Sequence, residues 1–313
     1  FSAYKHMLAD DPDFIVFLGD YIYEVGYGTD RVRRYAGPAM ARTLAEYRQL
    51  HAQYKTDRFL QEAHRQVPFV LTWDDHEVNN DYATDRSEFL DPDFLSRRAS
   101  AYQAYFEHLP LGLDARPRGA DMRIYQDFAW GRLGRFYVLD DRQYRDPQPC
   151  SDPAKGGGGS TIVDCKDRED PRRSLLGREQ EAWLAGAFGR SRSTWNFITQ
   201  QTLMCQQDAG EGSQVAYLSD NWDGYPAARN RLWADARKAK LANPVVLGGD
   251  IHASVIGEVH EDFSRPGSPV VAAEFVGTSV TAEGWSQAAY DARLKKNPHL
   301  KYANSASRGY IGI

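Results

Sequence analysis

Mostly apolar runs that alternate with amphipathic stretches indicate an α/β protein. Continuous apolar runs are typical of strands buried on both faces, and they occur at 14–18, 67–73, 133–139, 195–199 and 244–247. Apolar residues at helical spacing predict helices at 1–10, 44–63, 94–108, 177–188 and 229–242. Residues 122–128 are expected to pair with 133–139 as antiparallel strands, and alternation in 255–280 also favours antiparallel strands.

No internal repeat or interdomain linker interrupts this pattern, so a single domain is expected over residues 1–313. The residues alone favour three layers, α/β/α, around a largely mixed sheet. An opening helix that leads to a buried strand normally follows an earlier strand, and 308–313 begins like a strand and stops. We therefore expect the domain to be trimmed at both ends.

Composition excludes some classes of function. Hydrophobic residues make up 42% of the chain, which is enough for a sizeable core. The formal net charge is −5, so stable nucleic-acid binding is not expected, because a surface that follows a phosphate backbone is normally basic. No stretch approaches the roughly 20 apolar residues of a transmembrane helix. We expect a monomer without a transmembrane segment.

Two of the three cysteines, Cys150 and Cys165, bracket a loop rich in Pro, Gly, Ser and Asp. Such a loop buries little apolar surface, and a disulfide would hold it together. A disulfide would indicate an oxidising compartment, while a pair of reduced thiols is the alternative. The third cysteine, Cys205, is left over.

Acidic residues and histidines follow three of the predicted strands. Asp20 comes after the first, Asp-Asp-His-Glu at 74–77 after the second, and Asp250 and His252 after the run at 244–247. Taken singly, each is explained by a tight turn or a helix cap. Together they favour a metal site, because strand ends of an α/β sheet face one crevice and clustered carboxylates resist ionisation without a cation.

Five segments resemble the PhoD-type alkaline phosphatases and follow the same order across almost the whole chain. They are 14–24 (FIVFLGDYIYE), 70–80 (VLTWDDHEVNN), 139–145 (LDDRQYR), 221–226 (NWDGYP) and 246–254 (VLGGDIHAS). That family belongs to the calcineurin-like, or purple-acid-phosphatase-like, metallophosphoesterases. The resemblance implies a four-layer α/β/β/α sandwich with mixed sheets, which we adopt in place of three layers. It also implies Fe3+ and Ca2+ as cofactors, and a secreted or periplasmic protein exported by the twin-arginine route.

The resemblance assigns metal ligands to five positions. Asp20 would bridge two metals, and Tyr23 would bind ferric iron, the alternative for Tyr23 being an ordinary buried aromatic. Asp75 stands at the ligand position of the superfamily's Gly-Asn-His-Asp motif, and Asp250 and His252 match its late Asp-x-His pair. One departure concerns the iron site: the family carries a cysteine ligand on a strand before the first helix, and none of the three cysteines occupies that place.

The resemblance also implies residues for catalysis and substrate binding. His76 would protonate the leaving group, and Asn80 would be a nearby polar contact for the substrate. Arg142 would hold two phosphoryl oxygens with its planar guanidinium. The alternative for Arg142 is a surface ion pair with Asp140 or Asp141.

The expected activity is metal-dependent hydrolysis of phosphate mono- and diesters by a metal-activated water. A non-catalytic or calcium-only module is an alternative, which the missing cysteine favours. A phospholipase-D-like or nucleotide phosphodiesterase is a further alternative. In that case Trp222, Tyr225 and Trp285 would offer a stacking or apolar surface, although such residues more often pack in a core.

Overall fold

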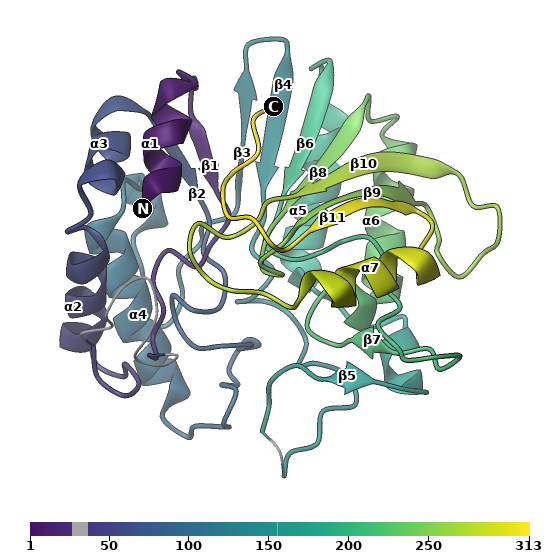
Figure 1. Cartoon of the computed structure of the whole chain (residues 1–313), viewed down its shortest axis with the longest axis horizontal. Helices are drawn as coiled ribbons and strands as arrows, with labels where there is room; N and C mark the ends of the chain where they lie inside the picture. The colour runs from purple at the N-terminus through teal and green to yellow at the C-terminus, as the bar shows by residue number, and fades with distance from the viewer. Residues whose placement is uncertain (27–36, 155) are drawn as a thin grey trace.

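The computed structural model describes residues 1–26, 37–154 and 156–313, and the described strands form two main sheets (Figure 1). In the smaller sheet, β1 (Ile15–Phe17) pairs in parallel with β2 (Phe69–Leu71). The larger sheet has seven strands in the order β11-β9-β10-β8-β6-β4-β3. Their bounds are β3 (Gln126–Trp130), β4 (Gly134–Val138), β6 (Trp195–Thr199), β8 (Pro244–Gly248), β9 (Ser254–His260), β10 (Val270–Val276) and β11 (Leu300–Asn304). A short separate pair joins β5 (Thr161–Ile162) to β7 (Tyr217–Leu218).

The larger sheet is mixed. Its strands β4, β6, β8 and β10 are parallel to one another, whereas β3, β9 and β11 are antiparallel to their neighbours. The runs predicted at 133–139, 195–199 and 244–247 become β4, β6 and β8, and the alternating segment 255–280 divides into β9 and β10. The predicted antiparallel pairing of 122–128 with 133–139 is present as the β3–β4 hairpin, but its first strand begins at Gln126 and continues to Trp130.

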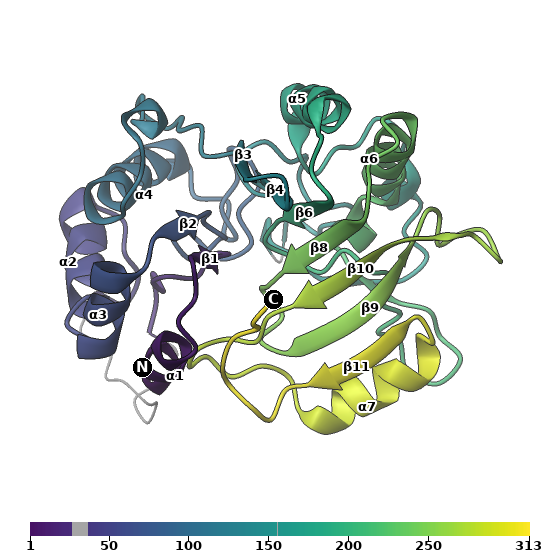
Figure 2. The same cartoon turned by 90° about the horizontal axis from the view of Figure 1, so that it is seen from above.

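Helices cover the outer face of each main sheet, as Figure 2 shows. The helices are α1 (Ser2–Ala9), α2 (Leu44–Tyr54), α3 (Arg58–Gln66), α4 (Phe94–His108), α5 (Gly177–Arg190), α6 (Pro226–Lys238) and α7 (Gln287–Lys296), with 3-10 turns at Leu113–Ala115, Lys166–Glu169 and Trp222–Gly224. One hydrophobic core joins α1–α4 to β1 and β2, and a second joins α5–α7 to the larger sheet. The fold is therefore the expected four-layer α/β/β/α sandwich, and the three-layer prediction is wrong. Of its two main sheets the larger is mixed, whereas the described strands of the smaller are parallel.

Two local predictions need correction. The helix predicted at 44–63 is divided into α2 and α3, because the carboxylate of Asp57 accepts the backbone N–H groups of Phe59 and Leu60 and so begins a new helix. Residues 308–313 form no strand, and they lie instead along the space between the sheets. No helix within the described ranges is long and apolar enough to cross a membrane.

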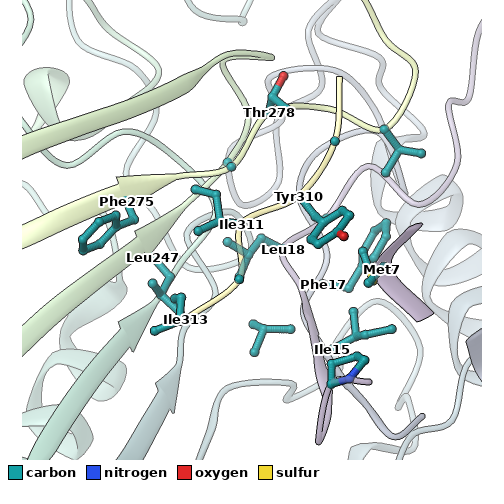
Figure 3. A pocket seen from close by; sticks show the side chains of 18 of the residues that line it. Met7, Ile15, Phe17, Leu18, Leu247, Phe275, Thr278, Tyr310, Ile311 and Ile313 are labelled. Carbon is teal, nitrogen blue, oxygen red and sulfur yellow. The ribbon is translucent and has the colours of Figure 1, made fainter. Parts of the chain in front are cut away.

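An apolar cavity of about 910 Å³ lies between the two main sheets. Figure 3 shows side chains from both sides of it, including Leu18 after β1, Leu247 on β8 and Phe275 on β10. Asp20 and His252 also belong to its lining. The cavity therefore borders the loops that follow β1 and β8, where the candidate site lies.

Candidate metal centre

Close backbone packing brings the first two acidic strand ends together. Gly19 has a φ of +115°, and a Cβ at this position would lie 2.3 Å from the backbone nitrogen of Asp74. Only glycine allows this approach. Asp20 and Asp250 themselves have φ values of 56° and 67°, a left-handed conformation that Asp adopts more readily than most residues. The turn expected from Gly-Asp is thus present, and it directs Asp20 toward the end of β2.

Three of the predicted ligands form a compact group of donor atoms. The Tyr23 hydroxyl donates to Asp20 Oδ2 at 3.0 Å and lies 3.0 Å from His252 Nε2. His252 Nε2 and Asp20 Oδ2 are 3.6 Å apart. Neighbouring donors on a six-coordinate cation with bonds of about 2.1 Å lie about 3 Å apart. The spacing of this Asp-Tyr-His group therefore fits one metal ion.

The loop after β10 holds His252 in one orientation. His252 Nδ1 donates to the carbonyl oxygen of Glu283 at 2.8 Å, so a neutral ring carries its lone pair on Nε2, toward Tyr23. Gly284 packs closely on the same histidine, because a Cβ there would lie 2.9 Å from His252 Cβ. Such control of a histidine tautomer is typical of metal ligands.

Asp75 lies at the centre of further candidate groups. Donor atoms of Asp20, Asp75 and His76 lie within 4.8 Å of one another, and so do those of Asp74, Asp75 and Asp250. Asp20 Oδ1 and Asp74 Oδ2 are buried without a hydrogen-bond partner among the described residues. Buried carboxylate oxygens normally have a partner. Cations in this crevice would supply one, so the residues fit a site for more than one metal.

Two carboxylates of the crevice, those of Asp74 and Asp250, resist ionisation in the absence of a cation. Burial raises the pKa of Asp250 to about 7. The charge of Arg142 opposes this rise, and repulsion from Asp75 adds to it. Burial also raises the pKa of Asp74 well above its ordinary value, against the effect of Arg142. The pKa of Tyr23 is raised by burial and then by Asp20. A bound cation would reverse these effects, because it favours the charged forms.

His76 is held by a buried carboxylate that the sequence analysis did not select. The Nδ1 atom of His76 donates to Glu24 Oε2 at 2.7 Å, and Glu24 is fully buried. Burial raises the pKa of Glu24, but His76 and the backbone N–H of Asn80 outweigh it and bring this pKa below its ordinary value. Asn80 is half-buried beside this pair.

Arg142 is buried at the centre of the acidic residues. Its Nε donates to Asp74 at 2.5 Å, Nη1 to Asp220 at 2.6 Å and Nη2 to Asp250 at 3.2 Å. The surface ion pair with Asp140 or Asp141 is therefore absent, since Arg142 has an exposed fraction of 0%. The guanidinium binds carboxylates from three different loops and ties them into one cluster.

Asp220 and Asp81 complete the acidic cluster, and neither was selected from the sequence. A carboxylate oxygen of each lies within 4.8 Å of Asp75. Asp220 stands immediately before the segment NWDGYP at 221–226, so its place beside a family motif was an available signal. Asp81 directly follows VLTWDDHEVNN in the same way.

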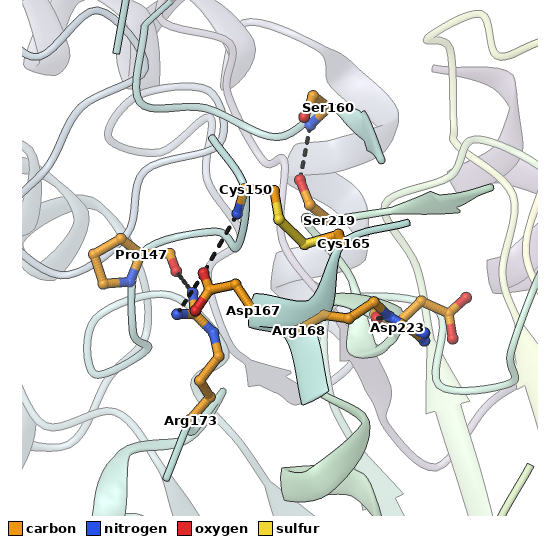
Figure 4. Close-up of a disulfide and its surroundings, with 9 residues drawn as sticks. All are labelled: Pro147, Cys150, Ser160, Cys165, Asp167, Arg168, Arg173, Ser219 and Asp223. Atoms are coloured by element: carbon orange, nitrogen blue, oxygen red, sulfur yellow. Dashed lines mark hydrogen bonds and ion pairs between the residues drawn. A yellow bond between two sulfur atoms is a disulfide. The ribbon is translucent and has the colours of Figure 1, made fainter. Parts of the chain in front are cut away.

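The cysteines lie elsewhere. Cys150 and Cys165 form a disulfide (Figure 4). Cys205 is buried in the core of the larger sheet. No described cysteine therefore belongs to the candidate metal groups.

Comparison with known proteins identifies the family. The family model described as PhoD-like phosphatase matches residues 1–313. Alkaline phosphatase D of Bacillus subtilis (strain 168) is 42% identical over 322 residues, covering 99% of this chain but 54% of the relative. A solved structure titled "Structure of PhoD" has a TM-score of 0.89 at 41% identity and covers 99% of this chain and 60% of its own. The chain thus spans about half the length of the curated relative it matches, and it belongs to the PhoD-like phosphatase family.

Proposed function

We propose that this chain hydrolyses phosphate mono- and diesters with the help of cations held in the acidic crevice. The observation that carries the proposal is the convergence of Asp20, Tyr23 and His252, whose donor atoms are 3.0 to 3.6 Å apart. The name of the relative alkaline phosphatase D supports the same reaction. The shared family supports a phosphate ester as the substrate.

The chemistry of the donors supports two kinds of cation. We infer that Asp20, Tyr23 and His252 hold ferric iron, because a phenolate and an imidazole suit a small, highly charged transition metal. Asp75 and Asp250 offer carboxylate oxygens, which suit calcium, and Asp20 would be shared between the two sites. When bound, the cations would neutralise charge on the phosphoryl oxygens and acidify a water molecule.

The remaining residues have roles in binding and proton transfer. His76 would give a proton to the leaving oxygen, which is easier to expel once it is protonated. Arg142 would keep the carboxylates ionised and in place. To contact the phosphoryl group as well, Arg142 Nη2 would give up its hydrogen bond to Asp250 for one to a phosphoryl oxygen. At 3.2 Å, the bond to Asp250 is the longest of the three that the guanidinium makes to carboxylates. Asn80 is the proposed polar contact for the substrate.

Replacement of Asp20 tests the proposal. Asp20→Asn is expected to lower kcat on p-nitrophenyl phosphate by about 100-fold or more, since loss of even an outer-shell partner of a metal site costs about 10–100-fold. Elemental analysis should show less iron and calcium in the same protein. The exposed Asp85→Asn variant is the matched control and should behave as wild type. Unchanged turnover by Asp20→Asn with full metal content would refute the proposal. Wild-type protein that holds calcium but no iron and has no activity would favour the calcium-only module.

Activity on diesters separates the remaining substrate classes. Trp222 and Tyr225 have exposed fractions of 0%, so they belong to the core and offer no stacking surface for a base. Trp285 is 42% exposed, but the Arg293 guanidinium lies over its ring at 3.7 Å. These positions give a nucleotide-specific diesterase no particular support. A panel of phospholipid, nucleotide and simple aryl diesters would measure the preference directly.

The disulfide supports a location in an oxidising compartment. Cys150 and Cys165 are 15 positions apart in the sequence, and the loop between them is rich in glycine. Disulfides persist in secreted and periplasmic proteins and are rare in the cytosol. We therefore infer a secreted or periplasmic protein.

A further inference from the structure

We propose that Glu24 is a positioning residue that orients His76 for proton donation to the leaving group. This inference rests on the proposed function, in which His76 acts on the substrate. Glu24 lies four residues after Asp20, in the irregular segment that follows β1. Its Oε2 accepts a 2.7 Å hydrogen bond from His76 Nδ1.

Glu24 is itself firmly held. Its second oxygen, Oε1, accepts the backbone N–H of Asn80 at 2.8 Å and the side-chain amide of Asn79 at 3.1 Å. Glu24 and Asn79 are both fully buried. A buried carboxylate is costly unless donors surround it, so a carboxylate with three such donors has little freedom to move. The chain therefore presents a fixed acceptor to one side of the histidine ring.

A ring contact with Tyr23 also restricts His76. The Tyr23 ring lies 4.3 Å from the His76 ring, centroid to centroid, at an interplanar angle of 35°. Tyr23 is also the proposed iron ligand, so His76 contacts both a proposed metal ligand and Glu24. With Nδ1 directed at Glu24, Nε2 points from the opposite side of the ring and is the atom that would act on the substrate.

A fixed carboxylate on Nδ1 suits a proton donor. In the protonated ring, Glu24 balances the positive charge. As the P–O bond breaks, the Nε2–H proton moves to the leaving oxygen, and the electron pair of that N–H bond stays on Nε2. The ring is then neutral and keeps its Nδ1 proton on the hydrogen bond to Glu24. Without Glu24, the ring could rotate or carry its proton on the wrong nitrogen.

The dependence of turnover on the leaving group tests this role. A p-nitrophenolate leaves without a proton, whereas an alkoxide needs one. In Glu24→Gln, we expect kcat on an alkyl phosphate to fall about 10–100-fold, the range for partners of active-site ligands, and kcat on p-nitrophenyl phosphate to fall much less. The ratio of the two kcat values is the readout, and iron and calcium content should be unchanged.

A matched control uses the same substitution at another buried glutamate. Glu274 on β10 is fully buried and accepts the backbone N–H groups of Met204 and Cys205, each at 2.7 Å. Glu274→Gln should lower stability without changing the ratio of the two kcat values. If Glu24→Gln does not fold, Glu24→Asp keeps the charge but shortens the side chain, and it should change the ratio in the same direction.

A double variant separates positioning from general support of the site. In the His76→Gln background, Glu24→Gln should have little further effect on the kcat ratio, because the residue it positions is gone. Three results would each overturn the inference. The kcat ratio could be unchanged in the single Glu24 variants, or kcat could fall equally on both substrates together with a loss of metal. The third is a full further effect of Glu24→Gln on the ratio in the His76→Gln background. A wild-type protein that hydrolyses neither ester would instead refute the proposed function, and the inference with it.

Discussion

Single residues decide how the strand ends meet. The pair Gly19-Asp20 is compatible with a turn and with a ligand position. The structure shows the turn, and it places Asp20 within hydrogen-bond distance of Tyr23, so the ligand role stays a proposal. The partners of Arg142 were not predictable in this way. Asp74, Asp220 and Asp250 are far apart in the sequence, and only the packing of three loops brings them to one guanidinium.

The close approach at Gly19 gives a prediction for stability. Gly19→Ala combines a strained φ of +115° with a Cβ only 2.3 Å from Asp74 atoms, so the two strand ends must separate. We expect a loss of several kcal/mol in the free energy of unfolding, clearly above the roughly 1–2 kcal/mol for left-handed strain alone. Gly131→Ala is the control, because Gly131 has a φ of +55° and a Cβ at this position would meet no atom within 4 Å. Equal urea midpoints for the two variants would refute this account.

Elements were predictable where one local pattern determines them. The helix predicted at 94–108 coincides with α4 (Phe94–His108), and β6 coincides with the run at 195–199. The division between α2 and α3 was missed, because the apolar spacing continues across it and only the cap at Asp57 breaks it. Helix α7 was missed because Tyr290 is its one buried residue, so it has no apolar stripe to detect.

A buried histidine on α2 predicts acid sensitivity of the helical layer. Neither ring nitrogen of His51 has a hydrogen-bond partner among the described residues, and its ring stacks on His108 at 5.2 Å. Burial, followed by the charges of His108 and Lys55, holds the pKa of His51 well below its ordinary value of 6.5. Between the folded-state pKa of His51 and pH 6.5, the unfolded chain therefore binds up to one more proton than the folded chain. Over that window this group should lower stability by up to about 1.4 kcal/mol for each pH unit.

The variant His51→Leu tests this directly. It removes the unpartnered ring while nearly preserving volume, so the loss of stability between pH 7.5 and pH 5 should be smaller than in wild type. Urea denaturation at both pH values measures the difference. The exposed His6→Leu is the control and should leave the pH dependence as it is in wild type. An identical pH dependence in His51→Leu and wild type would contradict the prediction.

The arrangement of layers could not be derived from residues alone. An apolar run buried on both faces looks the same whether its neighbouring layer is a helix or a second sheet, which is why the pattern favoured three layers. The family resemblance was needed to indicate four. Likewise, β11 pairs with β9 only after the chain has passed through α7, so neither its partner nor its register was visible in the sequence.

The disulfide loop connects a distant part of the chain to the acidic cluster. Within this loop, the backbone N–H of Gly159 donates to Asp81 Oδ2 at 2.8 Å, and that of Ser160 donates to Ser219 Oγ at 2.9 Å. Ser219 directly precedes Asp220, one of the carboxylates on Arg142. The loop therefore supports two residues of the cluster, although it contributes no candidate ligand itself.

Loss of the disulfide should weaken both stability and the site. Closing a loop of 15 residues restricts the unfolded chain, and the expected stabilisation is about 3 kcal/mol. The variant Cys150→Ala/Cys165→Ala should lose this amount in urea denaturation and should also have a reduced kcat, because Asp81 and Asp220 lose part of their support. A phosphine reductant should bring wild type to the level of the variant and leave the variant unchanged. A variant as stable and active as oxidised wild type would mean that the contacts around Gly159 and Ser160 hold the loop without the covalent bond.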